Sequence, residues 1–176
     1  MKKVTYFAAA LILLLATTAW SEDKEGKAGS TATITVKVDG LTCTTSLGAG
    51  TFAVRAWSFG ATQSVGSASG GGAGAGKASV SDLSVQRKFD ECSPALFGGV
   101  TTGKHFTTLT LTQSDKKGPV MIVTLTDILI SSYQLTGSQA NVDPVESVSF
   151  NFAKICINDV DSGAKVCFDF KTNTAS

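Results

Sequence analysis

The feature that most constrains the fold of this chain is a series of short segments whose apolar residues alternate with polar ones. In residues 31–38, Ala32, Ile34, Val36 and Val38 fall on one face, and polar side chains, among them Thr33, Thr35 and Lys37, fall on the other. A period of two is typical of a half-buried β-strand. Further segments with strand character are residues 51–59, 77–89, 105–114, 120–126, 128–135, 145–157 and 165–170. Asp115-Lys116-Lys117-Gly118 predicts a hairpin turn between two of them.

One segment has the start and stop signals of a helix. Ser93-Pro94 predicts an N-cap followed by the first helical residue, and Gly103 predicts the C-terminal end. The chain has 176 residues, which suits one domain better than two. We therefore predict an all-β fold with one short helix, a small antiparallel β-barrel over residues 31–171, followed by a flexible tail at 172–176.

Two of the expected strands are irregular. Residues 51–59 are apolar on both faces, which predicts a strand covered on both sides by a helix or a neighbouring subunit. In residues 77–89 the apolar residues change face near Asp82, which predicts a β-bulge. Residues 66–76 are almost all Gly, Ser and Ala, typical of a flexible linker. Gly76-Lys77 does not indicate a phosphate loop, because Ala78 stands where Ser or Thr is needed and a strand follows.

The N-terminus has the pattern of a signal peptide over residues 1–21. Lys2 and Lys3 precede an apolar run at 7–16, and small residues at Ala19 and Ser21 predict cleavage before Glu22. The run is short for a membrane span, so we expect no stable membrane anchor after cleavage. An uncleaved N-terminal anchor is the alternative. Residues 22–30 are charged and small, which predicts a flexible leader. The signal peptide itself predicts an exported protein, either secreted or periplasmic.

Export changes the meaning of the four cysteines, Cys43, Cys92, Cys156 and Cys167. An even number in an oxidising compartment predicts two disulfides. A zinc site is a poor interpretation, because the chain has no Cys-x-x-Cys pair and its one histidine is far from all four in sequence.

The last hairpin suggests the pairing. If the chain folds back at Asp161-Ser162, Ile155 lies opposite Phe168 and Ile157 lies opposite Val166, with these apolar residues facing the core. The same register places Cys156 opposite Cys167, within reach of a disulfide. A turn longer by one residue, with Gly163 in a bulge, would shift this register. A Cys43–Cys92 disulfide then follows mostly by elimination.

No catalytic, cofactor-binding or metal site is predicted. His105 would be needed for a Ser-His-Asp site, but it lies where the expected helix gives way to a strand. Asp127, Asp143 and Glu146 could form paired carboxylates, yet they lie at strand ends and in a loop, where acidic residues are common. Residues 159–163 resemble the start of a calcium loop but lack its later Glu, so a hairpin turn is the better interpretation. A net charge of +1 gives no strong attraction to nucleic acid or anionic lipid.

Five blocks of residues carry a resemblance to a known family. They are Ala56-Trp57-Ser58-Phe59-Gly60-Ala61-Thr62-Gln63-Ser64, Gly76-Lys77-Ala78-Ser79-Val80-Ser81-Asp82-Leu83, Ser93-Pro94-Ala95-Leu96-Phe97, Thr102-Gly103-Lys104-His105 and Val148-Ser149-Phe150-Asn151-Phe152-Ala153-Lys154. In this order and at these spacings the chain resembles the haemolysin-coregulated protein (Hcp) family from about Ile34 to Phe170. That family forms ring-shaped building blocks of the type VI secretion tube.

The resemblance implies a non-enzymatic structural protein without a cofactor. It also implies a homo-oligomeric ring of six subunits, and partners in the secretion apparatus or among effectors. The chain departs from the family in three ways: a signal peptide, four cysteines, and Thr42-Cys43-Thr44-Thr45-Ser46 where the family tends to have a charged loop. Two other functions stay open. One is a secreted monomeric binding or adhesion module that kept the barrel, and the other is a small secreted hydrolase using His105.

Overall fold

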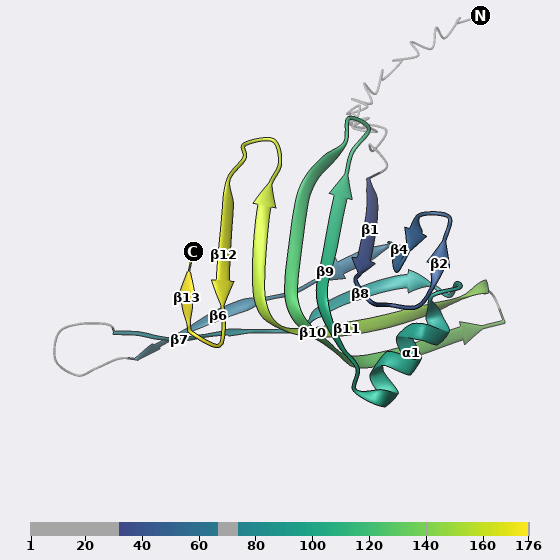
Figure 1. The fold of residues 1–176 in the computed structure, drawn as a ribbon, viewed down its shortest axis with the longest axis horizontal. Coiled ribbons are helices and arrows are strands. Elements are labelled where there is room, and N and C mark those ends of the chain that lie inside the picture. The colour runs from purple at the N-terminus through teal and green to yellow at the C-terminus, as the bar shows by residue number, and fades with distance from the viewer. Residues whose placement is uncertain (1–31, 67–73, 140, 176) are drawn as a thin grey trace, which may run out of the picture.

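The computed structural model describes residues 32–66, 74–139 and 141–175, and consists mainly of antiparallel strands (Figure 1). The largest sheet is formed by β1 (Thr33–Val38), β4 (Thr51–Val54), β5 (Ala56–Ser58), β8 (Leu83–Lys88), β9 (His105–Ser114), β10 (Pro119–Ser138), β11 (Asn141–Asp159), β12 (Lys165–Asp169) and β13 (Thr174–Ala175). Two small two-stranded sheets add β2 (Thr44–Thr45) with β3 (Gly48–Ala49), and β6 (Ala61–Gly66) with β7 (Gly74–Val80). The single helix among the described residues is α1 (Ser93–Thr102). The predicted class, mostly β with one short helix, is therefore confirmed.

The pairings of the large sheet follow a path that returns to its starting segment. From β4 the path runs through β1, β9, β10, β11 and β8 to β5, and every pair is antiparallel. Only Arg55 separates β4 from β5, and its backbone N–H donates to the Gln86 carbonyl at 2.8 Å. The buried side chains of these strands form one core, which includes Val36, Phe52, Val85, Leu109, Leu111, Leu125, Val148 and Phe150.

Two strand predictions are corrected at positions where the buried face changes. In residues 51–59, Phe52 and Val54 are buried, but the neighbouring Ala53 and Ala56 are exposed. After Arg55 the inward positions are Trp57 and Phe59, which pack against the core. The expectation that this strand is apolar on both faces was wrong, because a shift of phase at Arg55 brings both apolar sets to the same side.

Asp127 produces a similar shift inside β10. We predicted two strands separated there, but β10 is continuous through it. Asp127 has a φ of 55°, a conformation that is uncommon for a residue other than Gly. The buried positions change from Val123 and Leu125 to Ile128 and Ile130 across it. The register between β10 and β11 is the same before and after Asp127, since Thr126 pairs with Lys154 and Ile128 pairs with Phe152.

The single bulged strand expected at 77–89 is two strands. β7 ends at Val80 and β8 begins at Leu83, so the change of phase near Asp82 is a break between two sheets and not a bulge. β7 pairs with β6 in a two-stranded ribbon that projects from the body on the side away from α1 (Figure 1). The linker predicted at 66–76 is shortened, because β6 extends to Gly66 and β7 starts at Gly74. Residues 67–73 lie outside the described part.

The helix begins one residue earlier than predicted. Cys92 is the N-cap, and Gly103, with a φ of 62°, caps the C-terminal end as expected. Ser93 does not cap because its hydroxyl oxygen accepts the Asp90 backbone N–H at 2.9 Å and its hydroxyl donates to Glu146 Oε1 at 3.0 Å. The hairpin turn at Asp115 is confirmed, since its N–H donates to the Gly118 carbonyl at 2.9 Å.

The structure describes the C-terminal end of the chain but not its N-terminal end. The predicted signal peptide at 1–21 and the leader at 22–30 lie outside the described residues. The segment predicted as a tail, 172–176, contains β13, which pairs with β12 at Phe168–Ala175 and Asp169–Thr174. Paired strands therefore continue beyond residue 171.

Candidate assembly surfaces

His105 lies in an exposed polar cluster at the start of β9. Its Nδ1 is 3.3 Å from Asp127 Oδ1, and the Lys171 Nζ donates to Asp127 Oδ2 at 2.5 Å. The hydrogen bond from Lys171, followed by that from His105, holds the pKa of Asp127 below its ordinary value, and the same contact raises the pKa of Lys171. A contact between His Nδ1 and a carboxylate is one part of a Ser-His-Asp site, but the described residues that line the pocket at His105 include no Ser, Thr or Cys to act as the nucleophile. The cluster ties the end of β12 to β10.

Three carboxylates are candidates from the sequence for a catalytic pair. They lie in three different surroundings. Asp127 belongs to the exposed cluster described above. Asp143 forms an exposed ion pair with Lys88. Glu146 is fully buried. The structure does not bring them together as a pair that could divide acid and base roles.

In the turn that begins at Asp159, groups of the turn itself donate hydrogen bonds to the Asp159 carboxylate. Asp159 accepts hydrogen bonds from the Asp161 backbone N–H at 3.1 Å and the Ser162 hydroxyl at 2.8 Å. The Ser162 hydrogen bond lowers the pKa of Asp159. Within residues 32–66, 74–139 and 141–175, no group of three or more His, Cys, Asp or Glu side chains is placed to hold a metal ion.

A buried ionic network links β8, β10, β11 and α1. Arg87 and Glu146 are both fully buried, with Arg87 Nε 3.1 Å from Glu146 Oε1. The Tyr133 hydroxyl donates to Glu146 Oε2 at 2.6 Å, and burial, reinforced by this bond, raises the pKa of Tyr133. The Arg87 guanidinium also contacts Asp90 and lies 4.2 Å from the centre of the Phe52 ring.

Sequence reasoning missed this network although a signal was present. Arg87 has the same parity as Leu83 and Val85, and Glu146 has the same parity as Val148 and Phe150. A charged residue on the buried face of each of two strands points to a buried pair, because an isolated charge there would be too costly. β8 and β11 are adjacent strands, and Arg87 lies opposite Glu146 in their register.

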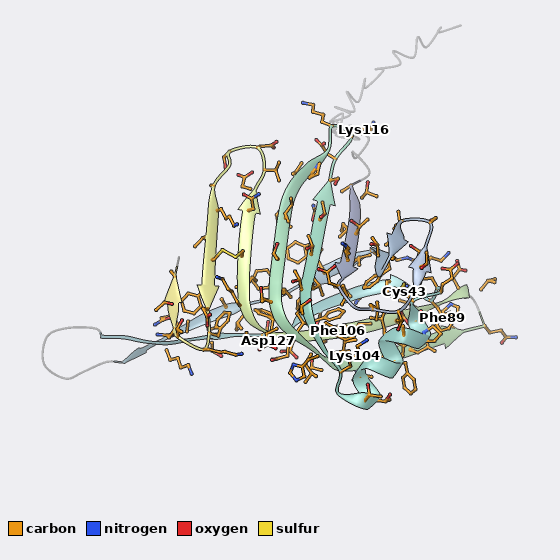
Figure 2. The ribbon with its side chains drawn as sticks, viewed as in Figure 1. Cys43, Phe89, Lys104, Phe106, Lys116 and Asp127 are labelled. Carbon is orange, nitrogen blue, oxygen red and sulfur yellow. A yellow bond between two sulfur atoms is a disulfide. The ribbon has the colours of Figure 1, made fainter. Side chains whose placement is uncertain are left out.

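The structure contains two disulfides in the pairing expected from the sequence. The Cys43 and Cys92 sulfur atoms are 1.98 Å apart and join the loop before β2 to the N-cap of α1 (Figure 2). Cys156 and Cys167 are directly opposite in the last hairpin, with sulfur atoms 2.02 Å apart. Val166 lies opposite Ile157 as predicted but is 55% exposed, so its expected burial in the core was wrong.

The first of two apolar surfaces is the helix cleft, a cavity of about 470 Å³ lined by Phe89, Ser93, Pro94, Phe97, Tyr133 and Leu135. Phe89, Phe97 and Leu135 are 46%, 54% and 51% exposed. Phe97 contacts Tyr133 edge to face, with ring centroids 5.7 Å apart. Figure 2 shows Phe89 beside α1. Large apolar side chains grouped in a cleft are typical of a binding surface, whereas single exposed ones are ordinary.

The second surface is the ribbon slot, a cavity of about 220 Å³ between the β6–β7 ribbon and the face of β11 and β12. Its lining is apolar and consists of Phe59, Ala61, Ala78, Val80, Ile155, Ile157, Val166, Cys167, Phe168 and Phe170. Phe168 and Phe170 contact each other at 4.9 Å between ring centroids. Because the ribbon does not cover this face completely, Val166 is left exposed.

The sequence profile of the family described as "Type VI secretion system effector, Hcp" matches residues 27–158, three quarters of the chain. The matched range contains α1, the strands from β1 to β10 and all but the last residue of β11. The chain belongs to the Hcp family. The Pseudomonas aeruginosa protein named "Protein hcp1" is 37% identical to it over 86 residues, 47% of this chain and 53% of that protein. The match thus spans about half the length of this curated Hcp relative.

Solved structures of type VI secretion and Hcp proteins share the fold. "Structure of a type six secretion system protein" covers 82% of this chain and 99% of its own, with 23% identity and a TM-score of 0.71. Hcp1 from Salmonella typhimurium covers 82% and 99%, with 24% identity and a TM-score of 0.69. Hcp2 from the same organism covers 81% and 98%, with 25% identity and a TM-score of 0.61. In the described ranges, this Hcp family member has no helix with the length and apolar character to span a membrane.

Proposed function

We propose that the mature chain is a non-enzymatic structural protein of the type VI secretion tube kind, which closes into rings of six subunits. Membership of the Hcp family, found over residues 27–158, is the observation that carries this proposal. We further propose that the strand path from β4 to β5 closes as a barrel, supported by the Arg55 hydrogen bond between its two ends.

A closed ring needs a heterologous contact, in which one face of each subunit meets a different face of the next. The sequence argument for such a contact came from residues 51–59, and their phase change removes it, since Ala53 and Ala56 offer little apolar surface. The helix cleft and the ribbon slot now supply that argument, because both have apolar linings that include exposed side chains, Phe89, Phe97 and Leu135 in the cleft and Val166 in the slot.

The place of assembly follows from the cysteines. Disulfides persist in oxidising compartments and are rare in the cytosol. Two disulfides, together with the signal peptide predicted at 1–21, support a protein that is exported and then assembles in the periplasm or outside the cell. N-terminal sequencing of exported protein should return Glu22; a sequence beginning at Met1 would remove the export proposal.

Sedimentation of the oxidised mature protein tests the ring. We expect a species of six chains at high micromolar concentration and ring-shaped particles in electron micrographs. A protein that remains monomeric under these conditions would favour the alternative, a secreted binding or adhesion module that kept the fold without assembling. The third function, hydrolysis through His105, has no comparable support, because a Ser-His-Asp site also needs a nucleophile and, in the described part of the chain, the residues that line the pocket at His105 include no Ser, Thr or Cys.

A further inference from the structure

The described surface has two apolar patches of different shape, which lie toward opposite ends of the molecule. The helix cleft is formed by α1 and the end of β10, while the ribbon slot lies where β6 and β7 leave the body (Figure 1). Two unlike patches at opposite ends suit head-to-tail contact between identical chains, which repeats around a ring. A single self-complementary patch would give a two-fold dimer instead.

The two patches differ in the side chains at their surface, and the difference suits a contact between them. The helix cleft is bordered by side chains that stand out from the surface, since Phe97 and Leu135 are both about half exposed. The ribbon slot is a smaller cavity, about 220 Å³ against about 470 Å³ for the cleft, with small side chains, Ala61 and Ala78, on its ribbon side. Large protruding side chains on one chain and an apolar slot on another form the kind of anchor-and-pocket contact that dominates interface energetics.

The charges beside the patches differ in sign. Next to the helix cleft, the three cations Arg55, Lys88 and Arg87 are outnumbered by the four carboxylates Asp90, Glu91, Asp143 and the buried Glu146, which leaves an excess of one negative charge. Beside the ribbon slot, Lys154 lies opposite Asp169 in the register of β11 and β12. The exposed Lys77 and Lys165 remain there, each one residue before a side chain that lines the slot.

We infer that the helix cleft of one chain binds the ribbon slot of a second copy, and that this contact is the subunit interface of the ring. The inference rests on the proposed function for the ring itself, and adds which two surfaces meet. Phe97 and Leu135 are the anchoring side chains, and Val166 is the exposed part of the slot that receives them. Opposite charges at the two rims help to set the orientation.

Two exposed substitutions separate the surfaces. Phe97→Glu disables the helix cleft and leaves the slot, whereas Val166→Glu disables the slot and leaves the cleft. Leu47→Glu is the matched control, because Leu47 is 49% exposed and lines neither cavity. Each purified mature protein is oxidised, its circular dichroism is compared with the parent chain, and its mass in solution is measured by light scattering. Leu135→Glu and Val166→Lys replace either main variant if it loses the parent spectrum.

The inference predicts that the parent chain and Leu47→Glu form the same ring, while Phe97→Glu and Val166→Glu are each monomeric. An equal mixture of the two monomeric variants should give a one-to-one heterodimer that grows no further, because it contains one intact cleft–slot pair. Rings from both variants would overturn the inference and leave the proposed ring intact. A mixture that stays monomeric, or a Val166→Glu homodimer, would also overturn it. A monomeric parent chain would overturn both the inference and the ring.

Discussion

At the scale of single residues, Arg87 and Glu146 show how this small fold holds charge in its interior. Both are fully buried, and their side chains meet at 3.1 Å between Nε and Oε1. Hydroxyls of Ser93 and Tyr133 donate to the same carboxylate, so both of its oxygens have hydrogen-bond partners. A buried charge is tolerated only when its partners remain in place. The pair therefore couples α1 and β10 to the β8–β11 pairing.

We expect Glu146→Ala to lower the free energy of unfolding by about 3–5 kcal/mol, because it leaves a buried guanidinium without its carboxylate. Urea unfolding of the oxidised protein measures this. Asp143→Ala is the control at an exposed ion pair, for which we expect a loss of about 1 kcal/mol or less. Replacing both charges, as Arg87→Met with Glu146→Leu, should recover most of the loss. Equal costs for Glu146→Ala and Asp143→Ala would contradict this account.

Asp127 is the residue whose titration reports its neighbours most directly. Its pKa lies below the ordinary value of 3.8, first because of Lys171 and then because of His105. Lys171→Ala should raise the pKa of Asp127 toward 3.8, while Lys116→Ala, in a distant turn, should leave it unchanged. Carboxyl-carbon NMR titration measures both.

The sign of the effect on stability follows from the direction of the shift. Because the folded pKa of Asp127 is the lower one, its contribution is present above the unfolded value and is lost as the pH falls through the folded value. The contribution of Asp127 to stability is therefore lost below pH 3.8, and this loss should be smaller in the Lys171→Ala variant. Unchanged titration of Asp127 in that variant would rule out the contact as its cause.

At the scale of elements, two adjacent glycines of α1 meet different surroundings. A Cβ added at Gly98 would meet no atom within 4 Å, whereas one at Gly99 would lie 2.8 Å from Ile130 Cδ1 and 3.3 Å from Phe106 Cζ. Ile130 and Phe106 are both buried, so neither can move far. Gly99 therefore sets how closely α1 approaches β10, while Gly98 faces open space.

The two glycines give a matched pair of substitutions. Gly98→Ala should stabilise the protein by up to about 1 kcal/mol, because Ala is the better helix former. Gly99→Ala should be destabilising by about 1–3 kcal/mol, since overpacking outweighs that gain. Thermal unfolding of both variants, each with its disulfides intact, measures the difference. A stabilising shift in both would show that α1 can move away from β10 at little cost.

At the scale of the whole molecule, the disulfides constrain the chain over different distances. Cys43–Cys92 joins segments 49 residues apart and fixes the loop before β2 to the start of α1. Cys156–Cys167 spans 11 residues within a hairpin that β11 and β12 already pair. The first disulfide restricts the arrangement of the body and helix, and the second restricts one edge of the sheet.

Replacing each pair with Ser should therefore have unequal effects. On the chain-entropy account the loss is about 4 kcal/mol for Cys43–Cys92 and about 3 kcal/mol at most for Cys156–Cys167. Hydrogen exchange should speed up across the fold in the first variant. In the second it should speed up first in β12 and β13, with the rest of the sheet still protected. Global loss of protection in the second variant would contradict this assignment.

Local patterns in the sequence determined much of the fold. Alternation of apolar residues predicted β1 and β9, and the short turn after Asp159 determined the register that places Cys156 opposite Cys167. Each depends on residues close together in the chain, where a period of two and a tight turn leave few alternatives. Gly103 ended the helix for the same reason, because a left-handed cap suits Gly.

Contacts between distant residues decided the rest. The phase changes at Arg55 and Asp127 depend on strands that pair across the sheet, and the sequence around each fits a simple strand or a break equally well. The Arg87–Glu146 pair joins residues that are adjacent only after β8 and β11 align. The helix cleft and the ribbon slot likewise exist only between separate elements. Burial is a property of the assembled fold, so which apolar side chains stay exposed was decided by the tertiary structure alone.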